Sequence, residues 1–304
     1  MFLNKVINKS INPSSISNYI KSLISLMKPR VMSLVIFTCA VGFLTSDPSL
    51  KTLNAIISII LVAMGAGAAG CLNMWYESDL DALMTRTCLR PIPTGKVNKK
   101  QALTFGILLS IFSVGALYYY TNFLSAFLLF FTIAFYLFVY TIWLKRKTPQ
   151  NIVIGGIAGS LPPVIGWSIS TNSISLVSIS LFLIIFFWTP SHFWALSLYK
   201  ADDYKKAKIP MMPITDGIEK TKLYILIYSL LMLPVVILPY LVNFSGLNYL
   251  VPTMILTLYY NFICIDLYRH KKNKFDLKKA KKVFAYSILY LFLIFLLFLL
   301  DYLI

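Results

Sequence analysis

The stretch NAIISIILVAMGAGAAGCLNMWYESDLD, residues 54–81, joins a long apolar run to a cluster of acidic residues. No charged residue interrupts it before Glu77, and an α-helix needs about 20 apolar residues to cross the hydrocarbon core of a bilayer. Asp79 and Asp81 follow Glu77 directly along the chain. The stretch therefore predicts a membrane-spanning helix whose end carries carboxylates.

The composition of the whole chain excludes a water-soluble globule. Of the 304 residues, 58% are hydrophobic and only 13% are charged, and the mean hydropathy is +0.76. Soluble domains are about 45–50% apolar and about 25% charged. Most of the surface must therefore face lipid. In this background we attribute the net charge of +17 to basic loops at the membrane surface, not to nucleic-acid binding.

Apolar runs of similar length recur along the chain, which predicts an all-α membrane protein of about nine transmembrane helices. Residues 1–30 are predicted to form a cytoplasmic N-terminal segment, without a cleaved signal peptide, and 31–304 a single polytopic domain. The nine spans are expected near residues 31–46, 54–74, 101–120, 123–143, 151–170, 176–198, 222–242, 248–268 and 284–304, the first being the shortest.

The basic residues predict the orientation of the spans. All 28 lysines and arginines except Lys51 lie before the first span or in the loops after the second, fourth, sixth and eighth spans. Loops rich in Lys and Arg stay in the cytoplasm. The N-terminus is therefore predicted to be cytoplasmic and, with nine spans, the C-terminus periplasmic. Adding or removing one span would destroy this alternation.

The first acidic cluster has the spacing of a metal site. Asn73, Glu77 and Asp81 lie at positions i, i+4 and i+8, so on a helix they share one face. Mg²⁺ in proteins is usually held by one or two carboxylates together with substrate phosphate oxygens. The alternative interpretation is a polar helix end that marks the membrane interface.

A basic run, RTCLRPIPTGK, follows at residues 86–96. Arg86 and Arg90 are i, i+4, and we expect them on a helix that ends at Pro91. Arginine binds phosphate oxygens bidentately. A diphosphate bridged by Mg²⁺ is one interpretation, and anchoring of the loop to anionic lipid is the other.

The second acidic cluster, LYKADDYKKAKIPMMP, occupies residues 198–213. Asp202 and Asp203 are adjacent, so only one of them is expected to face a site. The alternative is a solvated charged loop.

His192 lies inside the sixth predicted span. An ionisable residue there is a functional candidate, which could orient a substrate, shuttle a proton or ligate iron. An interhelical hydrogen bond is the alternative.

These residues resemble the motifs of the UbiA-type intramembrane prenyltransferases. The first motif of that family, Asn-x-x-x-Asp-x-x-x-Asp, is matched by Asn73, Glu77 and Asp81, with Glu in place of the middle Asp. The sequence looks most like the heme-farnesylating branch of the family. The matching stretches are LMKPRVMSLVIFT, NMWYESDLDALMTRT with RPIPTG, and SHFWALSLYKADDYKKAKIPMMP.

The resemblance implies an enzyme whose helices surround a central cavity open to the cytoplasm. It implies farnesyl diphosphate as donor, heme B (protoheme IX) as acceptor and, with addition of water, heme O as product. In this hypothesis Mg²⁺ is held by Asn73, Glu77, Asp81 and Asp203. The implied further site residues are Tyr204 in catalysis and Arg86, Arg90, Lys200, Asp202 and His192 in substrate binding.

The expected partners are the lipid bilayer and heme A synthase or terminal oxidase assembly factors, and the expected location is a bacterial inner membrane, since no Arg-rich presequence is present. Three alternative functions remain at this point. One is prenylation of an aromatic ring in quinone biosynthesis by another UbiA-type enzyme. The others are a transporter, whose ionisable residues form a relay at the membrane midplane, and a heme-binding scaffold without chemistry.

Overall fold

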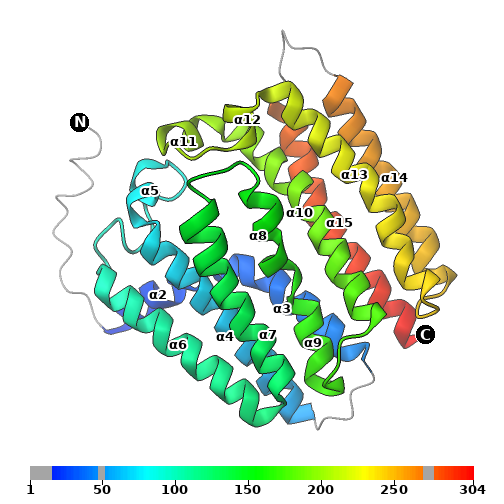
Figure 1. The fold of residues 1–304 in the computed structure, drawn as a ribbon, viewed down its shortest axis with the longest axis horizontal. Coiled ribbons are helices and arrows are strands. Elements are labelled where there is room, and N and C mark those ends of the chain that lie inside the picture. The colour runs from blue at the N-terminus through cyan, green and yellow to red at the C-terminus, as the bar shows by residue number, and fades with distance from the viewer. Residues whose placement is uncertain (1–15, 47–51, 270–276) are drawn as a thin grey trace.

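The computed structural model describes residues 16–46, 52–269 and 277–304, and these residues form helices and connecting loops without any strand. Figure 1 shows long helices that run side by side, with three short helices gathered at one end. The short helices are α5 (Ser78–Leu83), α11 (Ala201–Lys206) and α12 (Met212–Thr215). We call this end of the bundle the site end.

Each of the nine predicted spans corresponds to helical structure in the described residues. Eight helical stretches are long and apolar enough to cross a membrane, and the first, with the apolar segment Met32–Leu44, is shorter. The predicted all-α membrane fold is confirmed. The spanning helices are α3 (Pro29–Leu44), α4 (Thr52–Tyr76), α6 (Lys99–Tyr120), α7 (Phe123–Ala134) with η1 (Phe135–Leu144), α8 (Asn151–Ser160) with α9 (Pro162–Thr171), α10 (Leu176–Tyr199), α13 (Ile218–Leu241), α14 (Leu247–Arg269) and α15 (Leu277–Leu303).

Two spans are interrupted, each for a local chemical reason. The fifth breaks at Leu161, because Pro162 and Pro163 have no backbone N–H to continue the helical hydrogen bonds. The fourth ends in a π-helix, where the Thr141 hydroxyl donates to the Tyr136 carbonyl five residues earlier. π-helical turns are rare and frequently occur at functional sites.

The membrane core divides into two packed groups of helices. The helices α10, α13, α14 and α15 enclose large buried side chains, among them Trp194, Tyr260 and Tyr290. On the other side, α3 crosses α9 with the two backbones in contact: a Cβ added to Gly166 would come within 2.0 Å of the Cys39 carbonyl oxygen. Small residues allow this close helix approach where no hydrophobic force drives helices together in lipid.

Candidate active site

The first acidic motif lies at the junction of α4 and α5. Helix α4 ends at Tyr76, but the Glu77 amide donates to the Asn73 carbonyl over 2.9 Å and the Asp81 amide to the Glu77 carbonyl over 2.8 Å. The i, i+4 spacing therefore continues through the junction, as predicted. Asn73, Glu77 and Asp81 are each at most 3% exposed.

Each member of this motif is paired with a basic side chain from a different part of the chain. Lys28 Nζ donates to Asn73 Oδ1 over 2.7 Å. Lys145 Nζ lies 2.5 Å from Glu77 Oε2. Arg90 Nη1 donates to both carboxylate oxygens of Asp81, each over 2.8 Å. The start of α3, the end of η1 and the loop after α5 thus converge on the end of α4.

Lys28 was not among the predicted site residues. It has a left-handed backbone conformation, with φ of 55°, which costs a residue other than glycine about 1–2 kcal/mol. The following Pro29 disfavours the right-handed helical region at this position. Burial, reinforced by the positive charge of Arg90, lowers the pKa of Lys28 to about 7. A lysine directly before a proline at the mouth of the first span was the sequence signal for this residue.

Lys145 at the end of η1 was also missed. Although burial opposes its charge, the Glu77 carboxylate raises the pKa of Lys145, and Tyr204 acts in the same direction. The second carboxylate oxygen of Glu77, Oε1, is buried and has no hydrogen-bond partner among the described residues. An unpaired buried carboxylate oxygen is costly, and it is a donor of the type that a hard cation takes.

Asp203 of the second acidic motif contacts the loop that follows the first motif. The Thr85 hydroxyl, in the loop after α5, lies 2.8 Å from each carboxylate oxygen of Asp203. Asp203 and Tyr204 are buried, whereas Asp202 is exposed. The prediction that only one of the adjacent aspartates is turned inward is confirmed.

The predicted helix through Arg86 and Arg90 is wrong. Helix α5 ends at Leu83, Met84 is extended, and the chain then forms turns up to Arg90. The Thr87 hydroxyl donates to the Asp81 carbonyl over 3.0 Å, a bond that competes with continuation of the helix. Arg90 consequently folds back onto Asp81, while Arg86 is exposed.

The two remaining predicted residues, Lys200 and His192, lie at different depths in the helix bundle. Lys200 is half-buried at the start of α11. His192 is buried farther inside α10, where its Nδ1 lies 2.7 Å from the Ser287 hydroxyl of α15. Its ring stacks against Trp188 and Phe284, at centroid distances of 4.3 and 4.7 Å. The interhelical hydrogen bond considered for His192 is therefore present, and its role toward a substrate stays a prediction.

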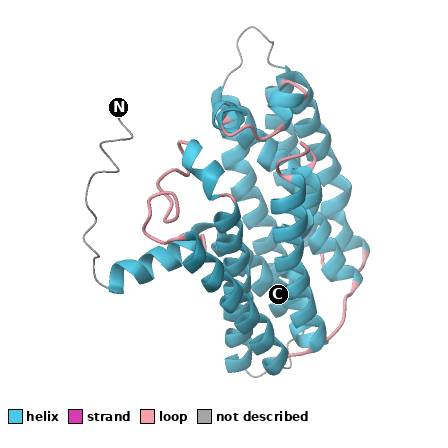
Figure 2. Cartoon of the chain, turned by 60° about the vertical axis from the view of Figure 1, so that its left-hand side comes forward, coloured by secondary structure: helices cyan, strands magenta, loops and turns pink. Residues whose placement is uncertain are grey.

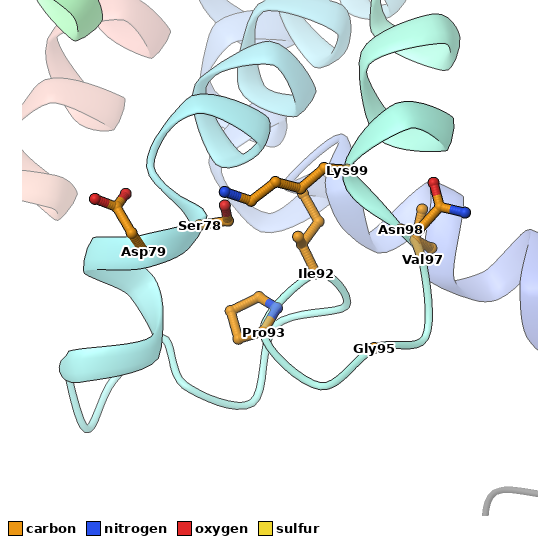
Figure 3. Close-up of a pocket in the computed structure, with 8 residues that line it drawn as sticks. All are labelled: Ser78, Asp79, Ile92, Pro93, Gly95, Val97, Asn98 and Lys99. Atoms are coloured by element: carbon orange, nitrogen blue, oxygen red, sulfur yellow. The ribbon is translucent and has the colours of Figure 1, made fainter.

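Asp79 is not a member of this set of ion pairs. It forms a two-fold hydrogen-bonded ion pair with Arg146, at 2.9 and 3.0 Å, and its side chain is 53% exposed. Burial alone would raise the pKa of Asp79, but the hydrogen bonds from Arg146 lower this pKa below its usual value. Figure 3 shows Asp79 beside a shallow pocket of about 300 Å³ between the start of α5 and the loop before α6.

The oxygen donors of the site fit a hard divalent cation. Asn73, Glu77, Asp81 and Asp203 offer one amide and three carboxylate groups, and Glu77 Oε1 is unpaired. Within the described ranges no group of three or more His, Cys, Asp or Glu side chains stands preassembled for a metal. The carboxylates are instead matched with bases or a hydroxyl.

A carboxylate motif at the end of a membrane-spanning helix, surrounded by basic side chains, is the arrangement that the resemblance to the intramembrane prenyltransferases implies. The sequence matches the UbiA prenyltransferase family over residues 34–289, so the chain belongs to this family and is a prenyltransferase. Its relatives include proteins named protoheme IX farnesyltransferase. That of Pelagibacter ubique is 69% identical over 99% of both chains, and that of Rickettsia bellii is 50% identical over 96% of this chain and 97% of its own.

Solved structures share the fold. A digeranylgeranylglyceryl phosphate synthase superposes with a TM-score of 0.76 at 17% identity, covering 93% of this chain and 98% of its own. A UbiA homolog from Archaeoglobus fulgidus, bound to GPP and Mg²⁺, gives a TM-score of 0.67 at 18% identity, covering 91% and 99%. At this identity the likeness is one of fold.

Lys28 should contribute strongly to turnover. We expect Lys28→Met to lower kcat/KM by about a hundredfold, because it removes the amine that donates to Asn73 Oδ1 and that, in its protonated form, places positive charge beside the motif. Lys28→Arg should restore part of the rate, since the charge returns. Initial rates in detergent or nanodiscs measure both. Lys220→Met removes an exposed lysine paired with Asp216 and serves as control; an equal loss in both methionine variants would contradict this role for Lys28.

Proposed function

We propose that the protein transfers the farnesyl group of farnesyl diphosphate to a vinyl group of heme B and, with addition of water, forms heme O. The observation that carries the proposal is that Asp203 of the second acidic motif binds Thr85 in the loop after the first motif, whose three polar side chains are each paired with a lysine or arginine. The choice of heme as acceptor is supported by relatives named protoheme IX farnesyltransferase, up to 69% identical over nearly the full length.

We assign Asn73, Glu77, Asp81 and Asp203 as the residues that would hold Mg²⁺. When bound, the ion would neutralise charge on the diphosphate and so make it a better leaving group. The unpaired Glu77 Oε1 supports this assignment within the chain. The Archaeoglobus homologs bound to Mg²⁺ with GPP or DMAPP support it by analogy of fold.

The bases would receive the diphosphate. Lys28, Lys145 and Arg90 are held around the motif by its own carbonyl and carboxylate oxygens. Arg86 and Lys200 are proposed to reach the leaving group from the exposed rim. Positive charge already in place stabilises the oxygens that gain charge as the farnesyl C–O bond breaks.

The farnesyl cation would then be consumed by the heme vinyl group. The terminal vinyl carbon forms the new C–C bond, water adds at the neighbouring carbon, and that water gives up one proton. Tyr204 is buried beside the site, where its ring would shield the cation from early attack by water. Asp202 and His192 are proposed to bind substrate, Asp202 from the exposed face of α11 and His192 from within α10.

We propose a multi-pass protein of the bacterial inner membrane, with the site end and the N-terminus in the cytoplasm and the C-terminus in the periplasm. The asymmetry of basic residues supports this orientation. Such a site would take prenyl chains from the lipid and keep the diphosphate near water. Heme A synthase or oxidase assembly factors would receive the product.

The acceptor can be tested directly. Membranes that contain the protein should convert heme B, with farnesyl diphosphate and Mg²⁺, into heme O, identified by chromatography and mass. Hydroxybenzoate offered with the same donor should remain unmodified. Prenylation of hydroxybenzoate alone would replace the heme proposal with the aromatic-ring alternative.

His192 offers a test of heme handling. His192→Ala removes both the ring between Trp188 and Phe284 and the bond to Ser287, and we expect weaker heme binding and slower turnover. Ser287→Ala removes the bond to His192, together with the bond that the Ser287 hydroxyl donates to the Phe284 carbonyl within α15, but keeps the histidine ring, and it serves as the matched control. If heme affinity and rate stay at wild-type levels in His192→Ala, the histidine is structural.

A further inference from the structure

Helix α2 (Ile16–Leu26) has no part in the proposed chemistry, yet it leads directly into Lys28. Figure 2 shows it as the first helix after the grey N-terminal trace, transverse to the spanning helices and extending from the body of the bundle. It packs on α4 and α6 near their site ends. A helix in this position lies outside the bundle that the spans form.

The residues of α2 divide into three faces. Leu23 and the fully buried Leu26 pack against the cluster that Cys71 and Ala102 form between α4 and α6. A polar stripe at i, i+4 and i+8, consisting of Ser17, Lys21 and Ser25, is exposed.

Between these two faces lies an apolar pair that contacts no protein core. Ile20 and Ile24, at i and i+4, are 49% and 50% exposed. Isoleucines on the outer side of a transverse helix, beside a polar stripe that carries a lysine, are typical of a helix that lies in a membrane interface.

The charge of the surrounding sequence identifies the kind of lipid. The first 46 residues contain Lys5, Lys9, Lys21, Lys28 and Arg30 and no acidic residue. Basic segments next to a membrane are attracted to anionic lipid headgroups.

We propose that α2 lies in the interface of the bilayer on the site side, with Ile20 and Ile24 among the acyl chains and Lys21 at anionic phosphate headgroups. It thereby anchors the segment that presents Lys28 to Asn73. The placement of α2 does not depend on the proposed function. Only the importance of Lys28 for the reaction rests on the proposed function.

The connection from α2 to Lys28 is short and closely fitted. Met27 lies against Gly67 of α4, where an added Cβ would come within 2.8 Å of the Met27 Cε atom. An added Cβ at Gly70 would lie 3.5 Å from Lys28 Cδ and 3.7 Å from the Leu26 carbonyl oxygen. Because the chain lies directly on this glycine face, a displacement of α2 would be carried to Lys28.

The placement can be measured with nitroxide spin labels on the full chain. Single cysteines would be introduced as Ile20→Cys, Ile24→Cys, Ser17→Cys and Ser25→Cys, with Cys88→Ser, because the other three native cysteines are buried. In nanodiscs of phosphatidylcholine and phosphatidylglycerol, collisions with oxygen report acyl chains and collisions with a water-soluble nickel chelate report solvent.

We expect labels at 20 and 24 to favour oxygen and labels at 17 and 25 to favour nickel. Equal access of nickel to all four positions would overturn the proposal, and so would protection of 20 and 24 from both reagents, which indicates a protein partner. With phosphatidylcholine alone, labels at 20 and 24 should shift toward nickel; an unchanged depth would overturn the role of anionic lipid.

The anchoring of Lys28 has its own readout. We expect Ile20→Asn with Ile24→Asn to increase modification of Lys28 by an amine-reactive reagent, quantified by mass spectrometry. The matched control, Ser17→Asn with Ser25→Asn, adds the same side chains to the polar stripe. This control should leave the modification of Lys28 unchanged. Unchanged Lys28 reactivity in the isoleucine pair would overturn the anchoring. Neither readout uses turnover, so both remain decisive if the acceptor is not heme.

Discussion

Replacing Asp81 by asparagine is expected to abolish prenyl transfer while leaving the protein folded and inserted. The substitution keeps the shape of a side chain that is 3% exposed, but removes the charge that holds Arg90. It also removes a proposed metal ligand, and we expect kcat to fall by about a thousandfold or more. Heme O formation is the measurement, with thermal stability and membrane yield as the checks on folding.

Asp79→Asn is the matched control, because Asp79 lies two residues away and has no place in the proposed metal set. Its carboxylate is half-exposed and binds Arg146, and exposed ion pairs contribute about 1 kcal/mol or less. We expect activity near that of the wild type. Turnover retained in Asp81→Asn would remove the metal role from the first motif, and loss in both variants would indicate a general effect of charge near α5.

The arrangement of the spans was predictable from the sequence because lipid imposes a strong rule on it. Backbone groups in the hydrocarbon core must be satisfied within each helix, so apolar length alone predicts a span. The first span was recognisable even though its apolar part, Met32–Leu44, is short, because the alternation of basic loops required it.

The partners of the acidic motif were less predictable. Lys28 and Lys145 lie 45 and 68 residues from the side chains they contact, so no local spacing links them to Asn73 and Glu77. They are brought together by the backbone turn before Pro29 and by the π-helical end of the fourth span. Neither feature has a periodic signature in the sequence.

The helix predicted for the arginines failed for a related reason. The i, i+4 spacing of Arg86 and Arg90 fits a helix, but spacing does not weigh competing hydrogen bonds. Thr87 bonds to the Asp81 carbonyl, and Asp81 attracts Arg90, so the chain forms turns instead. The consequence for the site is one arginine bound to the motif and one at the rim.

The contacts of Glu77 show what a glutamate does at the middle position of the first motif. Glu77 is one methylene longer than the Asp that the family motif carries there. It contacts Lys145 at the end of η1 with one oxygen and leaves the other unpaired. The longer side chain thus reaches Lys145 on the neighbouring span and still leaves one oxygen for the proposed metal ion.

Asp203→Asn is expected to lower kcat by about a hundredfold, because it removes a proposed metal ligand and weakens the hydrogen bonds that join the second acidic motif to the loop after the first. Asp202→Asn, at the adjacent exposed position, should cause a smaller loss. Asp216→Asn, at a partly buried aspartate paired with Lys220, controls for charge on this face. Initial rates at saturating farnesyl diphosphate distinguish the three variants.

Thr85→Val tests whether the hydroxyl bond matters, since valine has the shape of threonine without the hydroxyl that lies 2.8 Å from Asp203, and it keeps only the longer bond, 3.4 Å, from the backbone amide. If the two residues act through their mutual bond, the double variant Thr85→Val with Asp203→Asn should be no slower than Asp203→Asn alone. Independent, multiplying losses would mean that the motifs act separately. Because the proposed diphosphate site between the end of α4 and α11 uses both motifs at once, that result would contradict a single shared site.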